Sequence, residues 1–137
     1  MKKLLLLLAL GLTTLSMNAQ DLRNANNSSI GKIESDGTVR NSSNSTVGKI
    51  ERDGTIRNSS NSSIGKIESD GTIRNASNSS IGKVESNGTV RNGSNSAIGK
   101  IESDGTVRNS SKSCIGYAKG VPVRYAAVFF FFDFFKK

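Results

Sequence analysis

The stretch Ile30-Gly-Lys-Ile-Glu-Ser-Asp-Gly-Thr-Val-Arg-Asn41 is followed by Ser-Ser-Asn-Ser-Thr, and this 17-residue unit then repeats along the chain. The Ile-Gly or Val-Gly pair that opens each unit stands at positions 30, 47, 64, 81, 98 and 115, without an insertion. Five units are complete, and each has Asp-Gly or Asn-Gly at its centre: Asp36-Gly37, Asp53-Gly54, Asp70-Gly71, Asn87-Gly88 and Asp104-Gly105. A fixed period of this kind predicts a repeat architecture.

Each unit reads as a β-hairpin, because Asp-Gly between β-branched runs is a strong turn signal. A two-residue turn would put Ile33 opposite Arg40, an apolar side chain against a charged one. A three-residue loop, 35–37, puts Ile33 opposite Val39 and Lys32 opposite Arg40, and it places glycine where a left-handed residue is needed. We therefore predict the three-residue loop, with an apolar inner face and a charged, solvated outer face.

One hairpin cannot fold alone. It offers three apolar side chains, such as Ile30, Ile33 and Val39, whose burial contributes about 1.5–3 kcal/mol each. Ordering its backbone costs about 1–2 kcal/mol per residue. The hairpins must therefore share a core. Ile30 has the wrong parity for that core, unless Gly31 kinks the strand and turns Ile30 inward.

Half-units flank the five repeats. The segment around Leu22 matches the second half of a unit, and Ile115-Gly116 begins another first half. Placed side by side, the two would complete a unit and seal a ring, whereas open solenoids more often carry polar, atypical caps. We predict an all-β domain over residues 20–118, with five tandem hairpins in a closed pseudo-five-fold ring. A linear β-solenoid is the alternative.

The first 19 residues have the layout of a secretory signal peptide. Lys2 and Lys3 precede the apolar run 4–12, and small residues lead to a cleavage site after Ala19. The run is too short to span a bilayer. We expect an exported protein, periplasmic or extracellular, with no transmembrane segment in the mature chain.

Residues 119–137 form an apolar C-terminal segment. All six phenylalanines lie in it, within the run from Tyr125 to Phe135. The hairpins contain no aromatic residue, so we expect this segment to complete their thin core as a strand or a short helix; a short apolar run fits either. The alternative is that Tyr125 to Phe135 contacts a membrane surface or a partner.

The charges exclude some classes of function. The formal net charge is +8, but each repeat is close to neutral and its cations stand near anions. A nucleic-acid binder would carry a continuous basic face, so we expect no nucleic-acid partner. Cys114 is the only cysteine. It takes the place of Ser, Thr or Ala in the other units, which favours a small buried residue over a reactive thiol.

Catalysis is also poorly supplied. The sequence has no His, so nucleophile–base pairs built on His are absent. Glu34 and Asp36 have the residue types of a glycosidase pair, yet the same pair recurs in nearly every unit, which favours a structural role. The period of 17 differs from the nine-residue rhythm of calcium-binding repeats. We expect a non-enzymatic protein with no catalytic residue, no cofactor and no metal site; its binding residues are unknown.

Two classes of function remain. One is a structural or protein-interaction module of the cell envelope. The alternative is a multivalent glycan-binding module that uses five equivalent polar grooves, although the chain has no Trp and only Tyr117 and Tyr125 to stack on sugars. An unknown protein or glycan is therefore the expected partner.

The repeat unit, together with the closing segment Gly116-Tyr-Ala-Lys-Gly-Val-Pro-Val-Arg-Tyr-Ala-Ala and the phenylalanines after it, resembles the five-fold β-flower proteins exported by Bacteroidetes-type bacteria. The resemblance covers nearly all of residues 22–135. It implies hairpins arranged as petals around an axis of pseudo-five-fold symmetry. It implies no activity and no site residues.

Overall fold

The structure is a computed structural model that describes residues 20–135. The strands are β2 (Gln20–Asn24), β3 (Ser29–Ile33), β4 (Thr38–Asn41), β5 (Thr46–Ile50), β6 (Thr55–Asn58), β7 (Ser63–Ile67), β8 (Thr72–Asn75), β9 (Ser80–Val84), β10 (Thr89–Asn92), β11 (Ala97–Ile101), β12 (Thr106–Asn109) and β13 (Cys114–Tyr117). The helix is α1 (Val123–Phe131). The predicted signal peptide, residues 1–19, lies outside the described residues and stays a prediction.

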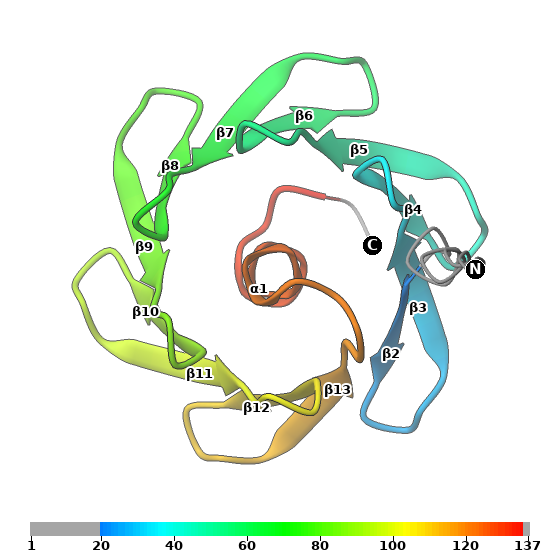
Figure 1. Ribbon diagram of the computed structural model, residues 1–137, viewed down its shortest axis with the longest axis vertical. Helices are drawn as coiled ribbons and strands as arrows, with labels where there is room; N and C mark the ends of the chain where they lie inside the picture. Colours follow the sequence, from blue (N-terminus) through cyan, green and yellow to red (C-terminus); the bar gives the residue numbers. More distant parts are fainter. Residues whose placement is uncertain (1–19, 136–137) are drawn as a thin grey trace, which may run out of the picture.

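The strands form one closed antiparallel ring (Figure 1). Each strand pairs with its neighbours in sequence, and β13 pairs with β2 to close the circle. The five tandem hairpins supply β3 to β12, and the two half-units supply β2 and β13. The predicted closed ring is confirmed, and the linear solenoid is wrong. Closure removes the two free edges that an open row of hairpins would expose.

The place where β13 meets β2 is the seam of the ring. Gly116 pairs with Asn24, and Tyr117 pairs with Arg23. This is the register that β3 and β4 share in the first hairpin. The two half-units therefore complete a further hairpin-like pair, as the sequence predicts, but no turn connects its strands.

The Asp-Gly loops have the predicted geometry. Ile33 pairs with Val39 and Lys32 with Arg40. Gly37 has φ +93°, a backbone conformation that residues with a side chain rarely adopt. A Cβ at this position would also clash with the Ile50 carbonyl oxygen of β5. We call the side of the ring that carries these loops (34–37, 51–54, 68–71, 85–88 and 102–105) the turn face.

The Ser/Asn-rich connectors are also ordered. The Asn41 side-chain oxygen accepts hydrogen bonds from the backbone N–H groups of Ser43 and Ser45, at 2.9 and 3.0 Å. Asn44 then takes a left-handed φ of 67°, which Asn tolerates better than most residues. Five further loops repeat this pattern. We call the side of the ring that carries them the petal face, because these loops form the tips in Figure 1.

Ile30 lies at a β-bulge. In the pairing of β2 with β3, Leu22 faces Gly31 and Arg23 faces Ser29, so Ile30 is an extra residue in its strand. The parity of Ile30 indicated a break in the regular strand, and the β-bulge is that break. Ile30 is half-buried and packs against the core without joining its fully buried residues.

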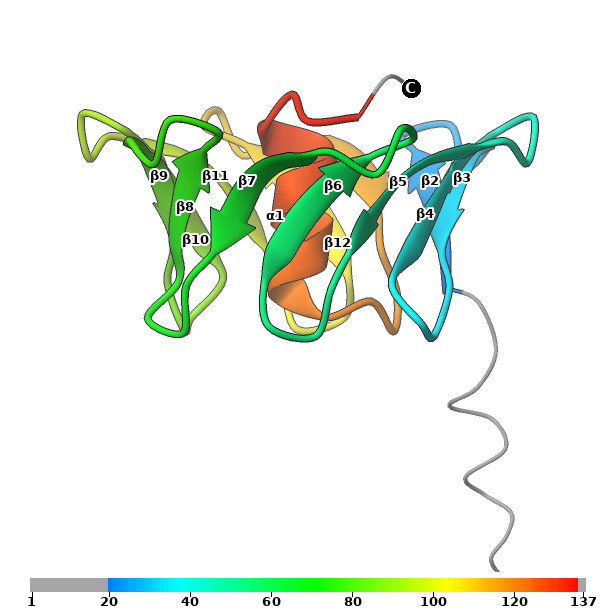
Figure 2. The same ribbon diagram turned by 90° about the horizontal axis from the view of Figure 1, so that it is seen from above.

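The C-terminal segment fills the centre of the ring. α1 enters at the turn face and ends at the petal face (Figures 1 and 2). Its residues Ala126 to Phe129 are at most 1% exposed. Of the two conformations that the sequence leaves open, helix is the one adopted. Every ring strand already has two neighbours, so a strand inside would leave its backbone polar groups unpaired, whereas a helix pairs its own.

Each phenylalanine of the segment lies against one inward-facing glycine of the ring. A methyl group on any of these glycines would meet the phenylalanine ring within 3.2 Å or less. The pairs are Gly31–Phe129, Gly48–Phe135, Gly65–Phe134, Gly82–Phe132, Gly99–Phe131 and Gly116–Phe130. Phe129, Phe132 and Phe135 are at most 7% exposed, so these three rings belong to the core. The alternative, that Tyr125 to Phe135 contacts a membrane surface or a partner, stays a prediction for the more exposed residues of the segment.

Candidate functional site

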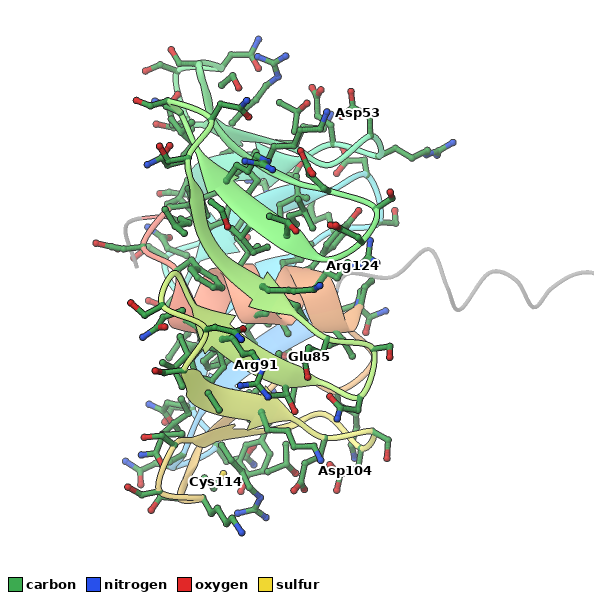
Figure 3. The ribbon with its side chains drawn as sticks, turned by 90° about the vertical axis from the view of Figure 1, so that its left-hand side faces the viewer. Asp53, Glu85, Arg91, Asp104, Cys114 and Arg124 are labelled. Carbon is green, nitrogen blue, oxygen red and sulfur yellow. The ribbon has the colours of Figure 1, made fainter. Side chains whose placement is uncertain are left out.

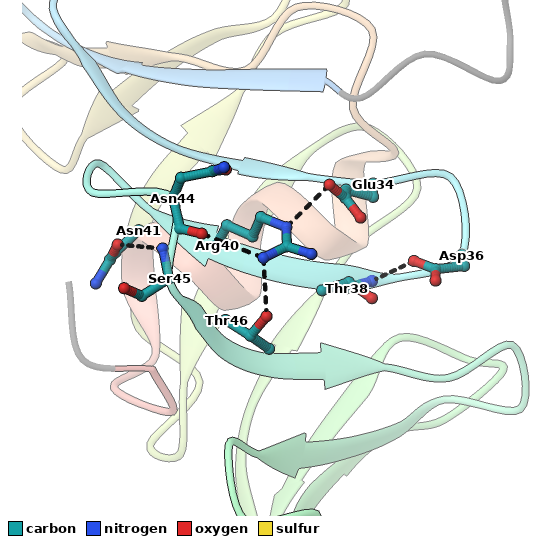
Figure 4. Close-up of polar contacts among 8 residues, drawn as sticks. All are labelled: Glu34, Asp36, Thr38, Arg40, Asn41, Asn44, Ser45 and Thr46. Carbon is teal, nitrogen blue, oxygen red and sulfur yellow. Dashed lines mark hydrogen bonds and ion pairs between the residues drawn. The ribbon is translucent and has the colours of Figure 1, made fainter.

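The outer wall carries a ladder of ion pairs, one for each tandem hairpin. Arg40 Nε donates to Glu34 Oε2 at 2.9 Å, and its Nη1 donates to the Asn44 carbonyl oxygen and to Thr46 Oγ1 (Figure 4). The equivalent pairs span 2.8–3.0 Å: Arg57–Glu51, Arg74–Glu68, Arg91–Glu85 and Arg108–Glu102. Partly exposed pairs of this kind contribute at most about 1 kcal/mol each. Each arginine therefore links the two strands of its hairpin to the connector that follows, and it adds little free energy of folding.

The aspartates of the turn face are held by their own loops. The Thr38 backbone N–H donates to Asp36 Oδ1 at 2.9 Å. This hydrogen bond and a second one from the Thr38 side chain lower the pKa of Asp36 below its usual 3.8. The pKa of Asp53, Asp70 and Asp104 is lowered by the same contacts with Thr55, Thr72 and Thr106. The recurring Glu/Asp pair thus has structural partners in each of these loops.

The amino end of α1 breaks the symmetry of the turn face. Arg124 Nη2 donates to the Ser69 carbonyl oxygen at 2.6 Å, and Nη1 donates to that of Glu68 at 3.3 Å. Figure 3 shows Arg124 on the same side of the ring as Asp53 and Asp104. A groove of about 600 Å³ lies beside it, and Tyr125 and Glu85 are among its lining residues. Arg124 thereby fastens the helix to one of the five loops.

The seam carries a second groove, of about 660 Å³. It is lined by Gln20, Asp21, Arg23, Asn27, Asp104, Tyr117 and Lys119. Arg23 Nη2 bonds Asp21 Oδ2 at 3.0 Å, and Arg23 Nη1 bonds the Asn27 carbonyl oxygen at 2.9 Å. A hydrogen bond with the Cys114 side chain raises the pKa of the Tyr117 phenol above its usual 10.0.

Cys114 does not lie in the core. The sequence predicts a small buried residue there, and this prediction is wrong: Cys114 is half-exposed and pairs with Arg108 of β12. The equivalent residues of the other units are exposed: Ser29, Thr46, Ser63, Ser80 and Ala97. The position is on the outer wall, where side-chain size is weakly restricted.

Sequence reasoning left the binding residues unknown and missed both grooves. The groove beside Arg124 depends on where the helix docks, which no local pattern reports. The seam groove had a signal, because Tyr117 replaces the lysine of every tandem hairpin. Among residues 20–135, the structure places no three His, Cys, Asp or Glu side chains together as a metal site. Within the same range it has no helix with the length and apolarity to cross a bilayer.

The comparisons with known proteins agree with this architecture. No curated protein and no solved structure matches the chain. The sequence profile of the 5-fold beta-flower proteins matches residues 19–135, which is most of the chain and includes every described strand and the helix. The chain belongs to the 5-fold β-flower protein family.

Proposed function

We propose that this chain is exported and serves, without catalysis, as a structural or protein-interaction module of the cell envelope. The β-flower repeat family fits a structural or interaction module. The observation that carries the proposal is the filled interior: α1 occupies the ring, and its phenylalanines rest on the glycines of the wall. A ring filled by its own chain has to meet other molecules with its outer wall and its two faces.

The use of the carboxylates supports a non-catalytic role. Glu34 is bonded to Arg40 and Asp36 to the Thr38 backbone, and the other tandem hairpins repeat the arrangement with Asn87 in one of them. A general acid or base needs a pKa near the working pH. The aspartates have theirs lowered, away from neutrality. Five near-identical copies suit a scaffold better than a single active centre.

Export rests on the amino-terminal sequence. Lys2, Lys3 and the apolar run 4–12 have the layout of a signal peptide, with a cleavage site after Ala19. The periplasm or the exterior is therefore the proposed location. The test is to express the full chain in a bacterium, fractionate the cells and determine the amino terminus by mass spectrometry. We expect a chain that begins at Gln20 outside the cytoplasm. An uncleaved chain in the cytoplasm would refute export.

The interaction role is tested by photocrosslinking in intact cells. A photoreactive amino acid is placed at Ser43 on the petal face, at Lys66 on the outer wall or at Ser103 on the turn face, all of them exposed positions. We expect a defined adduct with an envelope protein from at least one surface, absent without illumination. If none of the three positions yields a defined adduct, the interaction role is refuted.

A further inference from the structure

The seam is where the repeat pattern of the outer wall breaks. Tyr117 pairs with Arg23 in the register in which a lysine pairs with an arginine in each tandem hairpin. Those lysines are Lys32, Lys49, Lys66, Lys83 and Lys100. Lys119 lies 17 residues after Glu102, so it takes the place of the glutamate that forms an ion pair with the arginine in each tandem hairpin. Asp21 lies 17 residues before Thr38 and takes its place in the strand pairing. Three side chains that face outward are thus exchanged at one place.

These exchanges change what the wall offers to a ligand. In a tandem hairpin, the glutamate forms an ion pair with the arginine, and the lysine adds a further positive charge. At the seam, Arg23 is held by Asp21 and by the Asn27 carbonyl oxygen, and its partner on the neighbouring strand is Tyr117 instead of a lysine. Asp104 joins the groove from the last Asp-Gly loop, and Figure 3 shows it at the turn face.

The size and chemistry of the groove indicate a class of ligand. About 660 Å³ lies within the range of small-ligand sites, about 300–1,000 Å³. A phenol ring offers an apolar face that suits the C–H face of a pyranose, together with a hydroxyl that can donate. The carboxylates of Asp21 and Asp104 can accept hydrogen bonds from sugar hydroxyl groups. Arg23 and Lys119 can donate hydrogen bonds to the oxygen atoms of the sugar.

The charges select among sugars. Two carboxylates and two cations line the groove, so it presents no excess of either sign. Because the groove has no excess of positive charge, it offers a polyanion no net attraction, and a neutral ligand is favoured. We propose that the seam groove is a binding site for one or two residues of a neutral saccharide, stacked on Tyr117.

This site differs from the glycan hypothesis drawn from the repeats. Five equivalent grooves predict multivalent binding. Stacking on a sugar needs an aromatic residue, however, and among the described strands Tyr117 at the seam is the only one. The structure therefore assigns one saccharide to each chain. The inference goes beyond the proposed envelope role, and photocrosslinking tests that role independently of any sugar.

The test is calorimetric titration of the purified chain with neutral trisaccharides: maltotriose, cellotriose, mannotriose and N,N′,N″-triacetylchitotriose. We expect at least one of them to bind with a Kd below about 1 mM and a stoichiometry of one. Trigalacturonic acid is the acidic comparison and should bind more weakly. If no neutral sugar binds, or if the acidic sugar binds best, the proposal is overturned.

Three variants locate the site. Tyr117→Lys restores the residue of the tandem hairpins, so it should fold normally, and it should weaken binding at least about tenfold, or 1.4 kcal/mol. Tyr117→Phe keeps the ring and should retain most of the affinity. The double variant Tyr117→Lys/Lys100→Tyr moves the aromatic residue to a position without Asp21 and Lys119, and it should bind as weakly as Tyr117→Lys. Equal binding by Tyr117→Lys, or full recovery in the double variant, would overturn the assignment.

Discussion

The aromatic ring of Phe131 lies directly over the backbone of Gly99. A methyl group at Gly99 would overlap Phe131 Cε1 and Cζ and would lie 2.6 Å from the Arg108 carbonyl oxygen. The glycine is therefore required twice, by the neighbouring strand and by the segment inside the ring. The same relationship holds at five other glycines. It explains why a chain with six such inward glycines ends in six phenylalanines.

We predict that Gly99→Ala destabilises the protein by about 1–3 kcal/mol, the usual cost of overpacking a core. The free energy of unfolding in urea measures it. Gly93→Ala is the matched control, because a methyl group there meets nothing closer than 3.6 Å and Ala76 already fills the equivalent place. The control should change stability by less than about 0.5 kcal/mol. Equal stability of the two variants would contradict the packing described for Gly99.

Local pattern was enough to predict the wall of the ring. Asp36-Gly37 between β-branched runs sets the loop, and the loop sets Ile33 opposite Val39. The half-units at the two ends then predict closure. Each of these inferences uses residues that are near neighbours in sequence or copies at a fixed period, so the sequence carries them directly.

The interior could not be predicted in the same way. Whether Tyr125 to Phe135 forms a strand or a helix depends on the closed ring having no free edge, which is a property of the whole fold. The match of each phenylalanine to a glycine depends on how the helix is turned within the ring. The prediction for Cys114 was wrong because a small residue type suggests burial, whereas this position lies on the outer wall.

A second prediction concerns Lys112, which has φ +70° in its petal loop. Five equivalent loops have Asn there: Asn27, Asn44, Asn61, Asn78 and Asn95. This left-handed conformation costs a residue with a Cβ about 1–2 kcal/mol of conformational energy, and the cost is smaller for Asn than for Lys. Lys112→Asn should therefore raise the free energy of unfolding by about 0.5–1 kcal/mol, a part of the left-handed penalty. Arg108 bonds the backbone carbonyl of Lys112, a contact that the substitution leaves in place.

The reverse change provides the control. Asn95→Lys puts lysine into the neighbouring petal loop, where Arg91 makes the equivalent bond to the backbone carbonyl. It should lower stability by a similar amount. If both substitutions shift the urea midpoint in the same direction, the left-handed position is not what distinguishes the two residues.

A third prediction concerns acid pH. The pKa of four turn aspartates, Asp36, Asp53, Asp70 and Asp104, is lower in the folded chain than the usual 3.8, because each accepts hydrogen bonds from a threonine. The unfolded chain therefore binds these protons more readily than the folded chain does. The stability from these groups is fully present above about pH 5, and it is lost as the pH falls through the folded pKa values below 3.8.

Asn87 supplies the control for this acid effect. It occupies the same place in the fourth hairpin, and its Oδ1 accepts the Thr89 backbone N–H at 3.0 Å without a titrating group. Changing all four aspartates to Asn should keep the loops folded and reduce the loss of stability between about pH 5 and pH 3. Urea unfolding at each pH measures this. An unchanged acid dependence would show that these carboxylates do not govern it.

The last prediction concerns the segment inside the ring. Deleting residues 125–137 removes every phenylalanine and exposes the inner wall of the ring, including Ile33 and Val39, to water. The single variant Phe129→Ala, at a side chain that is 1% exposed, should already cost about 3–5 kcal/mol. We therefore expect the truncated chain to be unfolded or aggregated, with lost strand circular dichroism or increased binding of a hydrophobic dye. Asp133→Ser, at an exposed position of the same segment, should leave the fold and its stability nearly unchanged. A truncated chain that remains monomeric, with full strand content and an unchanged urea midpoint, would mean that the ring holds itself together without its contents; the six glycine–phenylalanine contacts would then have to serve a purpose other than stability.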